Sequence, residues 1–172
     1  MSKIRIFSLG GLNENGKNLY VVEVDKKIFV FDAGLKYDNE HNLGVDYIIP
    51  NYDYLVKNKK NIVGIFLTHG HESHIGALPD IVRAIPGLSV YGAKLTLDIL
   101  KKDMSDEDLK KVKLVEIKPH VKINFGRLSV LPILFQIHYY TFYILKMERL
   151  FIRGTLFLIP LYLKNIKQIL VN

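Results

Sequence analysis

Hydrophobic and polar positions in the first 130 residues follow the periods of strands and helices. Residues 3–9 alternate with a period of two, which predicts a strand with Ile4, Ile6 and Ser8 on one face and Arg5, Phe7 and Leu9 on the other. Residues 19–25 and 27–32 are β-branched and aromatic runs joined by a tight turn, which predicts a β-hairpin. Residues 62–67 form a continuous apolar run, which indicates a buried strand.

Short helices and further strands follow in turn. Helices are expected at residues 50–59, 75–84 and 94–102, and strands at residues 88–91, 113–118 and 121–124. Ser105 precedes acidic residues and is expected to cap another helix, while the charged segment 101–113 is expected to be a solvated helical face. Because strands alternate with helices and no repeat or linker interrupts them, the pattern predicts a layered α/β domain.

The character of the sequence changes near residue 131. Residues 131–145 and 150–163 are rich in apolar and aromatic side chains and have no consistent period of 2 or 3.6. A transmembrane segment is disfavoured, because the first run is shorter than the span of about 20 residues that a bilayer requires and contains Gln136 and His138. The pattern therefore divides the chain into a domain at 1–130 and a tail at 131–172.

Composition narrows the class of protein only slightly. The chain of 172 residues has 24 Lys and Arg against 17 Asp and Glu, a net charge of +7, which suits RNA or another polyanion. A lysine-rich solvated surface explains the same charge equally well. The absence of cysteine excludes disulfides and thiolate metal ligands, and the first seven residues are too charged for a signal peptide. A cytoplasmic protein outside the membrane is expected.

The candidate chemistry lies in the sequence Thr-His-Gly-His-Glu-Ser-His at residues 68–74. His69, His71 and His74 follow a predicted buried strand, and α/β sheets place their sites at the carboxyl ends of strands. Neutral imidazole is a common zinc ligand, so this spacing predicts a metal site. Gly70 is expected to permit a tight turn that points His69 and His71 at one ion. The remaining histidines, His41, His120 and His138, are expected to be incidental.

Several motifs resemble ribonuclease J of the metallo-β-lactamase superfamily. They lie at residues 10–18, 31–36, 66–72, 75–79, 91–92 and 95–97, and the resemblance extends from residue 3 to about residue 130. It implies a partial αββα sandwich, to which this chain would contribute the N-terminal half. The chain is then expected to supply one sheet and some of the helices, with an exposed inner face.

The resemblance also implies a function. Ribonuclease J is a two-metal, zinc-dependent ribonuclease in which further domains complete the RNA channel. By position, His69 and His71 would bind the first metal, and His74 would help to bind the second. Asp32 either ends a strand at a turn or orients the metal-binding histidines without binding the metal itself. Glu72 is expected to point away, and the residues do not distinguish 5′ exonucleolytic from internal cleavage.

The sequence departs from the family pattern in two ways. Ser73 occupies the motif position of an aspartate that ligates the second metal, and a hydroxyl is a poor substitute for that carboxylate. Two downstream motifs, Thr-His-Ser-Ile-Pro-Asp and Thr-Gly-Asp-Phe, are also missing. At most one zinc ion and no catalysis are expected from a truncated polypeptide. The alternatives are a non-catalytic subunit that pairs with an active paralogue, as a homo- or hetero-oligomer, and a pseudogene product without function.

A shifted reading frame would restore both motifs. With suitable synonymous codons, the bases from the end of codon 131 onward encode Thr-His-Ser-Ile-Pro-Asp. The bases from the end of codon 151 onward encode Tyr-Thr-Gly-Asp-Phe-Ile-Phe-Asp-Thr in the same frame, and the two motif threonines then start at codons 131 and 152, which are 21 codons apart. We therefore hypothesise a small insertion or deletion near codons 126–131, with residues 131–172 translated out of frame.

Overall fold

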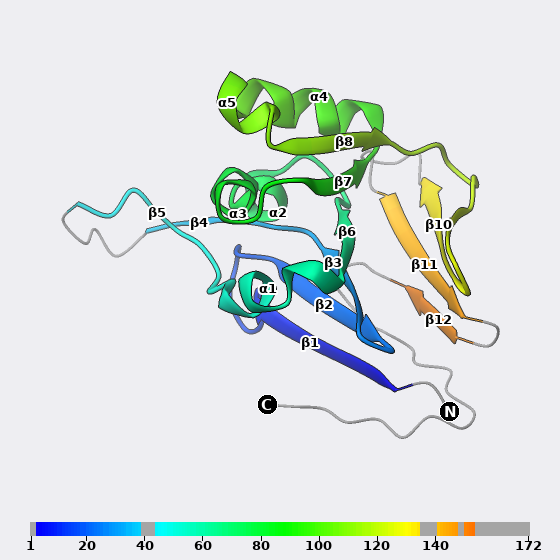
Figure 1. Ribbon diagram of the computed structural model, residues 1–172. Coiled ribbons are helices and arrows are strands. Elements are labelled where there is room, and N and C mark those ends of the chain that lie inside the picture. The colour runs from blue at the N-terminus through cyan, green and yellow to red at the C-terminus, as the bar shows by residue number, and fades with distance from the viewer. Residues whose placement is uncertain (1–2, 39–43, 135–140, 148–149, 154–172) are drawn as a thin grey trace.

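The larger of two main sheets carries the helices on one face (Figure 1). A computed structural model describes residues 3–38, 44–134, 141–147 and 150–153. The strands of this sheet are β1 (Ile4–Gly10), β2 (Leu19–Val24), β3 (Lys27–Phe31), β6 (Ile62–Phe66), β7 (Leu88–Gly92) and β8 (Val112–Glu116), in the order β1-β2-β3-β6-β7-β8. The first three strands pair antiparallel and β3, β6, β7 and β8 pair parallel, which confirms the predicted α/β architecture.

Short helices connect the parallel strands. They are α1 (Asp53–Lys57), η1 (Lys59–Asn61), α2 (Glu72–Ile75), α3 (Leu78–Ala84), α4 (Lys94–Asp103) and α5 (Asp106–Leu109). The helix predicted at 75–84 is two helices, because α2 already begins at Glu72 and Pro79 occupies the first turn of α3, where a missing N–H costs least. The predicted cap is confirmed, since the Ser105 hydroxyl accepts a hydrogen bond from the Asp108 N–H at 3.2 Å.

A second sheet of four antiparallel strands faces the first. Its strands are β9 (Ile123–Phe125), β10 (Leu128–Leu134), β11 (Thr141–Met147) and β12 (Leu150–Arg153), in the order β12-β11-β10-β9. The expectation of a single sheet is therefore wrong. Strand β10 was not predicted because its sequence does not alternate between apolar and polar residues. The consecutive residues Leu128, Ser129 and Val130 are all buried, as in a strand that is covered on both faces.

Two hydrophobic layers lie on opposite faces of the larger sheet. The first lies beneath the helices, and the second packs inner-face side chains such as Val22, Phe29 and Phe66 against Leu128 and Val130 of β10. Aromatic rings fill the second layer: the Phe66 ring stacks on Tyr91 at 4.7 Å between centroids, and the Phe29 ring meets Phe125 edge-on at 5.7 Å. The inner face that was expected to be exposed is thus covered.

The alternation predicted for β1 is confirmed. Ile4 and Ile6 belong to the layer between the sheets, whereas Phe7 and Leu9 pack beneath the helices. A separate two-stranded hairpin consists of β4 (Lys36–Tyr37) and β5 (Tyr47–Ile48). Across the part of the chain that the structure describes, every helix is too short or too polar to cross a bilayer.

Packing of the second sheet predicts a large effect of a charge at Val130. Val130→Asp would bury a carboxylate without a partner in the layer between the sheets, so its free energy of unfolding should fall by about 3 kcal/mol or more. Urea denaturation followed by circular dichroism measures this. Val121→Asp is the control, since that side chain is 52% exposed and should tolerate the charge. Equal stability of the two variants would contradict the packing of β10 on the larger sheet.

Candidate metal centre

The histidine loop leaves the carboxyl end of β6 and runs into α2. Strand β3 ends beside it, because Phe31 of β3 pairs with Phe66 of β6 in parallel register. Asp32 and Thr68 therefore leave the sheet at neighbouring points of the same edge. This is the edge at which parallel α/β sheets position their ligands, as the sequence predicted.

Backbone hydrogen bonds dock the histidine loop on the segment that follows β3. The Ala33 N–H donates to the His74 carbonyl at 2.7 Å. The Ser73 carbonyl accepts from both the backbone N–H of Asn18 at 3.1 Å and its side-chain amide at 2.9 Å. Gly34 lies so close to Ser73 that a β-carbon would overlap the Ser73 carbonyl. The glycine of Asp32-Ala33-Gly34 is thus required for close approach of two backbones.

Asp32 reaches His69 through the hydroxyl of Thr68. The buried Asp32 carboxylate accepts from the Thr68 N–H at 2.8 Å and from its hydroxyl at 2.9 and 3.0 Å. The same hydroxyl lies 2.9 Å from Nδ1 of His69. When the hydroxyl donates to Asp32, its oxygen accepts from Nδ1–H, and Nε2 of His69 then carries the lone pair. Such a partner behind a histidine orients the ring and fixes its tautomer.

Burial also sets the charge of these groups. Burial raises the pKa of the Asp32 carboxyl to about 7, against the opposing hydrogen bonds from Thr68. Burial, reinforced by neighbouring histidines, lowers the pKa of His69 to about 4 and that of His74 to about 3. Both rings are therefore neutral at pH 7, which is the form that binds a metal ion.

The three predicted histidines lie together. Nε2 of His69 is 3.1 Å from Nδ1 of His71, and the His69 and His74 ring centroids are 4.0 Å apart. Nδ1 of His74 pairs with the Ser73 hydroxyl at 2.9 Å. The sequence therefore identified side chains that the fold brings into one cluster.

The nitrogen pair of His69 and His71 fits two ligands of one ion. Zinc–nitrogen distances of about 2.0–2.1 Å in tetrahedral geometry place two ligand nitrogens roughly 3.3 Å apart, close to the 3.1 Å observed. A zinc site needs at least three protein ligands, and the described residues contain no group of three His, Asp or Glu side chains arranged to hold a metal. The described residues therefore present two ring nitrogens at hydrogen-bond distance, a spacing that also suits two ligands of one ion, and contain no complete metal site.

The expectation for Gly70 needs adjustment. Gly70 does not adopt a left-handed backbone; instead, a β-carbon there would crowd the Ile99 side chain at 2.7 Å, so the glycine gives α4 room to pack on the loop. Glu72 points away from the histidines, as expected, and accepts a hydrogen bond from the Tyr37 hydroxyl at 2.7 Å. His120 is exposed and apart from the cluster, whereas His41 and His138 lie outside the described residues.

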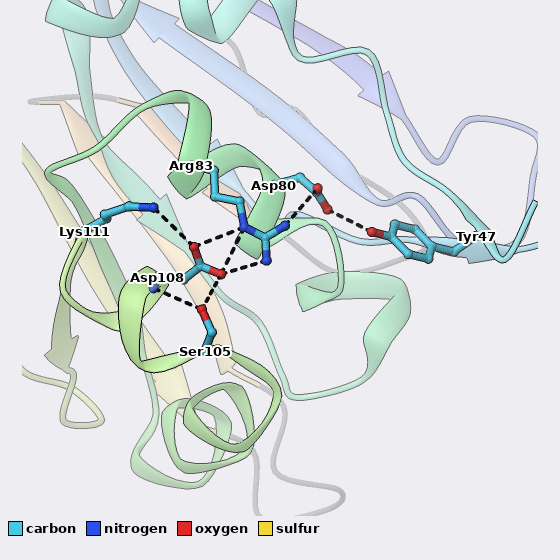
Figure 2. A network of polar contacts seen from close by, with 6 residues as sticks. All are labelled: Tyr47, Asp80, Arg83, Ser105, Asp108 and Lys111. Atoms are coloured by element: carbon cyan, nitrogen blue, oxygen red, sulfur yellow. Dashed lines mark hydrogen bonds and ion pairs between the residues drawn. The ribbon is translucent and has the colours of Figure 1, made fainter.

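The solvated face expected at 101–113 contains one buried acid. Asp108 is 1% exposed and accepts three hydrogen bonds from Arg83 of α3, at 2.7 to 3.1 Å (Figure 2). Ser105 and Lys111 complete the network around this carboxylate. Arg83 chiefly holds the pKa of Asp108 below its usual range. The expectation that residues 101–113 are all solvated is therefore wrong for Asp108, whose hydrogen bonds with Arg83 join α5 to α3.

Comparison with known proteins identifies the family of this chain. Residues 12–143 match the metallo-beta-lactamase superfamily. The chain belongs to the metallo-β-lactamase superfamily. In line with the motif resemblance, the protein named ribonuclease J 2 of Staphylococcus saprophyticus is 41% identical over 128 residues, which is 74% of this chain and 23% of the relative. The Streptococcus pyogenes protein of the same name is 46% identical over 101 residues, 59% of this chain and 18% of the relative.

This superfamily member therefore spans less than a quarter of the length of those curated relatives. Solved structures support the fold alone. The metallo-beta-lactamase fold protein YhfI from Bacillus subtilis aligns with a TM-score of 0.62 and 13% identity, over 87% of this chain and 61% of that chain. Zn(2+)-bound PqqB from Methylobacterium extorquens aligns with a TM-score of 0.57 and 11% identity, over 86% and 62%.

Sequence reasoning assigned no role to Asn18 or Thr68. Asn18 holds the Ser73 carbonyl, and Thr68 links Asp32 to His69. Both lie within the motifs that resemble ribonuclease J. Their contacts join positions 36 and 55 residues apart, so no local period reveals them.

Removing the charge of Asp32 should change how stability depends on pH. The pKa of Asp32 is raised from 3.8 to about 7 on folding, so its contribution is favourable at low pH and is lost as pH rises through this window. The lowered pKa values of His69 and His74 act in the opposite sense, destabilising the fold as pH falls below 6.5. Asp32→Asn keeps the pH dependence of stability that comes from the two histidines and removes the pH dependence that comes from the Asp32 carboxyl.

The unfolding free energy of Asp32→Asn should therefore rise relative to wild type between pH 4 and pH 7, by on the order of 3 kcal/mol, and level off above that. Urea titrations at several pH values in the presence of a chelator measure the difference. Asp53→Asn, at an exposed helix start, is the control and should leave the profile parallel to wild type. A parallel profile for Asp32→Asn as well would show that Asp32 does not change its protonation on folding in this way.

Proposed function

We propose that this chain is the metal-binding part of a ribonuclease J-type hydrolase of RNA phosphodiesters and that it does not catalyse the reaction as it stands. The observation that carries the proposal is the paired nitrogens of His69 and His71, followed by Ser73 at the position of the motif aspartate. Identity of 41% with ribonuclease J 2 over 128 residues supports RNA as the ancestral substrate. We place the protein in the cytoplasm, a reducing compartment that fits the absence of cysteine.

Each residue has a proposed role. His69 and His71 supply two of the ligands of one zinc ion, and Asp32, acting through Thr68, orients the His69 ring. His74 is the ligand that the chain retains for a second ion. When bound, such metals activate water and stabilise charge on the phosphate. Ser73 lacks the negative charge that a second ion needs, so at most one zinc binds here.

We further propose that the missing ligands are encoded in another reading frame from about codon 131. The tail beyond residue 130 is then an out-of-frame product rather than a native domain. AT-rich codons read out of frame give Phe, Leu, Ile and Tyr. Phe, Ile and Tyr have high β propensity, which is compatible with strands β11 and β12. The DNA sequence of the gene tests this proposal.

The second candidate function is a non-catalytic partner of an active paralogue. Ser73 favours it, because loss of one carboxylate removes chemistry and leaves the fold intact. A partner subunit needs no bound zinc, so metal stoichiometry separates the two functions. Presence of the protein in cells separates both of them from a product without function.

Introducing a carboxylate at position 73 should strengthen metal binding. Ser73→Asp adds an anionic oxygen next to the histidine cluster, so zinc affinity should rise by about tenfold or more. Isothermal titration calorimetry and metal analysis after gel filtration measure affinity and stoichiometry. Ser73→Asn is the matched control, since the asparagine side chain has the shape of aspartate without its charge. This variant should bind zinc like wild type.

His69→Ala should abolish zinc binding in both backgrounds, and neither wild type nor Ser73→Asn should cleave single-stranded RNA. Equal zinc affinity in Ser73→Asp and Ser73→Asn would contradict the role given to this position. Zinc-dependent RNA cleavage by the wild-type chain would contradict its proposed inactivity.

A further inference from the structure

Two exposed tyrosines face each other on the hairpin beside the histidine loop. Tyr37 of β4 and Tyr47 of β5 are directly opposite in the antiparallel register. Opposite residues of an antiparallel pair project from the same face, with β-carbons about 5 Å apart. The two residues are 52% and 44% exposed. Exposed rings in this arrangement form a small aromatic surface.

Hydrogen bonds at the ring tips hold both tyrosines in place. The Tyr37 hydroxyl donates to Glu72 of α2 at 2.7 Å, and the Tyr47 hydroxyl donates to Asp80 of α3 at 3.4 Å. An aromatic ring fixed at its tip loses little conformational entropy when a ligand packs on it. The surface is therefore organised before any ligand arrives.

A network of polar contacts connects Tyr47 to the protein interior. Figure 2 shows Asp80 between the Tyr47 hydroxyl and the Arg83 guanidinium, whose Nη1 lies 3.4 Å from Asp80. Arg83 in turn is fixed by the buried Asp108, which Ser105 and Lys111 also contact. The exposed ring is thus connected through two side chains, Asp80 and Arg83, to the buried Asp108 carboxylate.

The aromatic surface lies close to the candidate metal centre. The Leu35 N–H donates to the Glu72 carbonyl at 2.9 Å, which joins the start of β4 to the histidine loop. Tyr37 follows Leu35 by two residues, roughly 7 Å along an extended chain. Glu72 itself lies between His71 and Ser73. A ligand on the tyrosines would lie next to the loop that carries the histidines.

We propose that Tyr37 and Tyr47 form a stacking platform for bases of single-stranded RNA beside the histidine loop. The choice of RNA rests on the function proposed above and on the 41% identity with ribonuclease J 2. Bases stack on exposed aromatic rings without sequence preference. Glu72 and Asp80 at the ring tips repel phosphate there, which leaves the ring faces for bases and places the backbone elsewhere.

Binding of the full chain to two labelled oligonucleotides tests the platform. One is a single-stranded 12-mer of adenylate, and the other is an abasic strand of the same length with the same phosphates. Fluorescence anisotropy in a chelator measures dissociation constants without metal or cleavage. Wild type should bind the adenylate strand more tightly. Tyr37→Ala and Tyr47→Ala should each weaken adenylate binding by roughly 5- to 100-fold and leave abasic binding unchanged.

Matched variants separate stacking from charge. Tyr37→Phe and Tyr47→Phe retain the rings and should retain most of the preference for adenylate. Lys59→Glu and Lys60→Glu, at exposed positions of η1, should leave the preference for adenylate unchanged. Equal binding of the two strands by wild type, no binding of either, or equal loss of both in the tyrosine variants would overturn the platform.

Failure of the platform is distinguishable from failure of the proposed function. Base-dependent binding in chelator together with no zinc binding, even in Ser73→Asp, would leave the platform in place and reject the proposed zinc site. Zinc binding that follows the Ser73 prediction, with no difference between adenylate and abasic strands, would reject the platform alone.

Discussion

A buried carboxylate at the end of β3 fixes the geometry of the histidine loop. Asp32 adopts a left-handed backbone with φ of 60°, which turns the chain out of the sheet, and its side chain accepts the N–H and hydroxyl of Thr68 on the neighbouring strand. Through the same hydroxyl it reaches His69, and two residues later Gly34 allows the Ser73 carbonyl to pack against the backbone. The positions of the histidines depend on this junction of β3, β6 and the loop.

Apart from the short hairpin β4–β5, which was not predicted, the order of strands and helices up to residue 125 followed from local patterns. Alternation in β1 identified its two faces correctly because each face packs against a different hydrophobic layer. The second sheet was missed, because β10 is buried on both sides and its apolar run has no period of two. The division of one expected helix into α2 and α3 was also missed, although Gly76 and Pro79 lie at the junction.

The candidate site was predicted in its residues and only partly in its geometry. His69, His71 and His74 were identified by spacing, and the fold brings their rings together. The link from Asp32 to His69 depends on parallel pairing of β3 with β6, and the docking of Ser73 depends on Asn18. Such contacts between distant segments are set by tertiary structure, which local periodicity does not encode. The burial of Asp108 escaped notice for the same reason, since its partner Arg83 lies 25 residues away.

We have proposed that this chain retains part of a two-metal hydrolase site and that the remaining ligands are encoded in a displaced frame. Sequencing the gene from about codon 115 to well past codon 172 tests this proposal directly. We expect bases that, read from the end of codon 131, encode Thr-His-Ser-Ile-Pro-Asp and then Thr-Gly-Asp-Phe in one open frame. DNA whose shifted frame encodes neither motif would contradict it, and residues 131–172 would then have to be explained as native sequence.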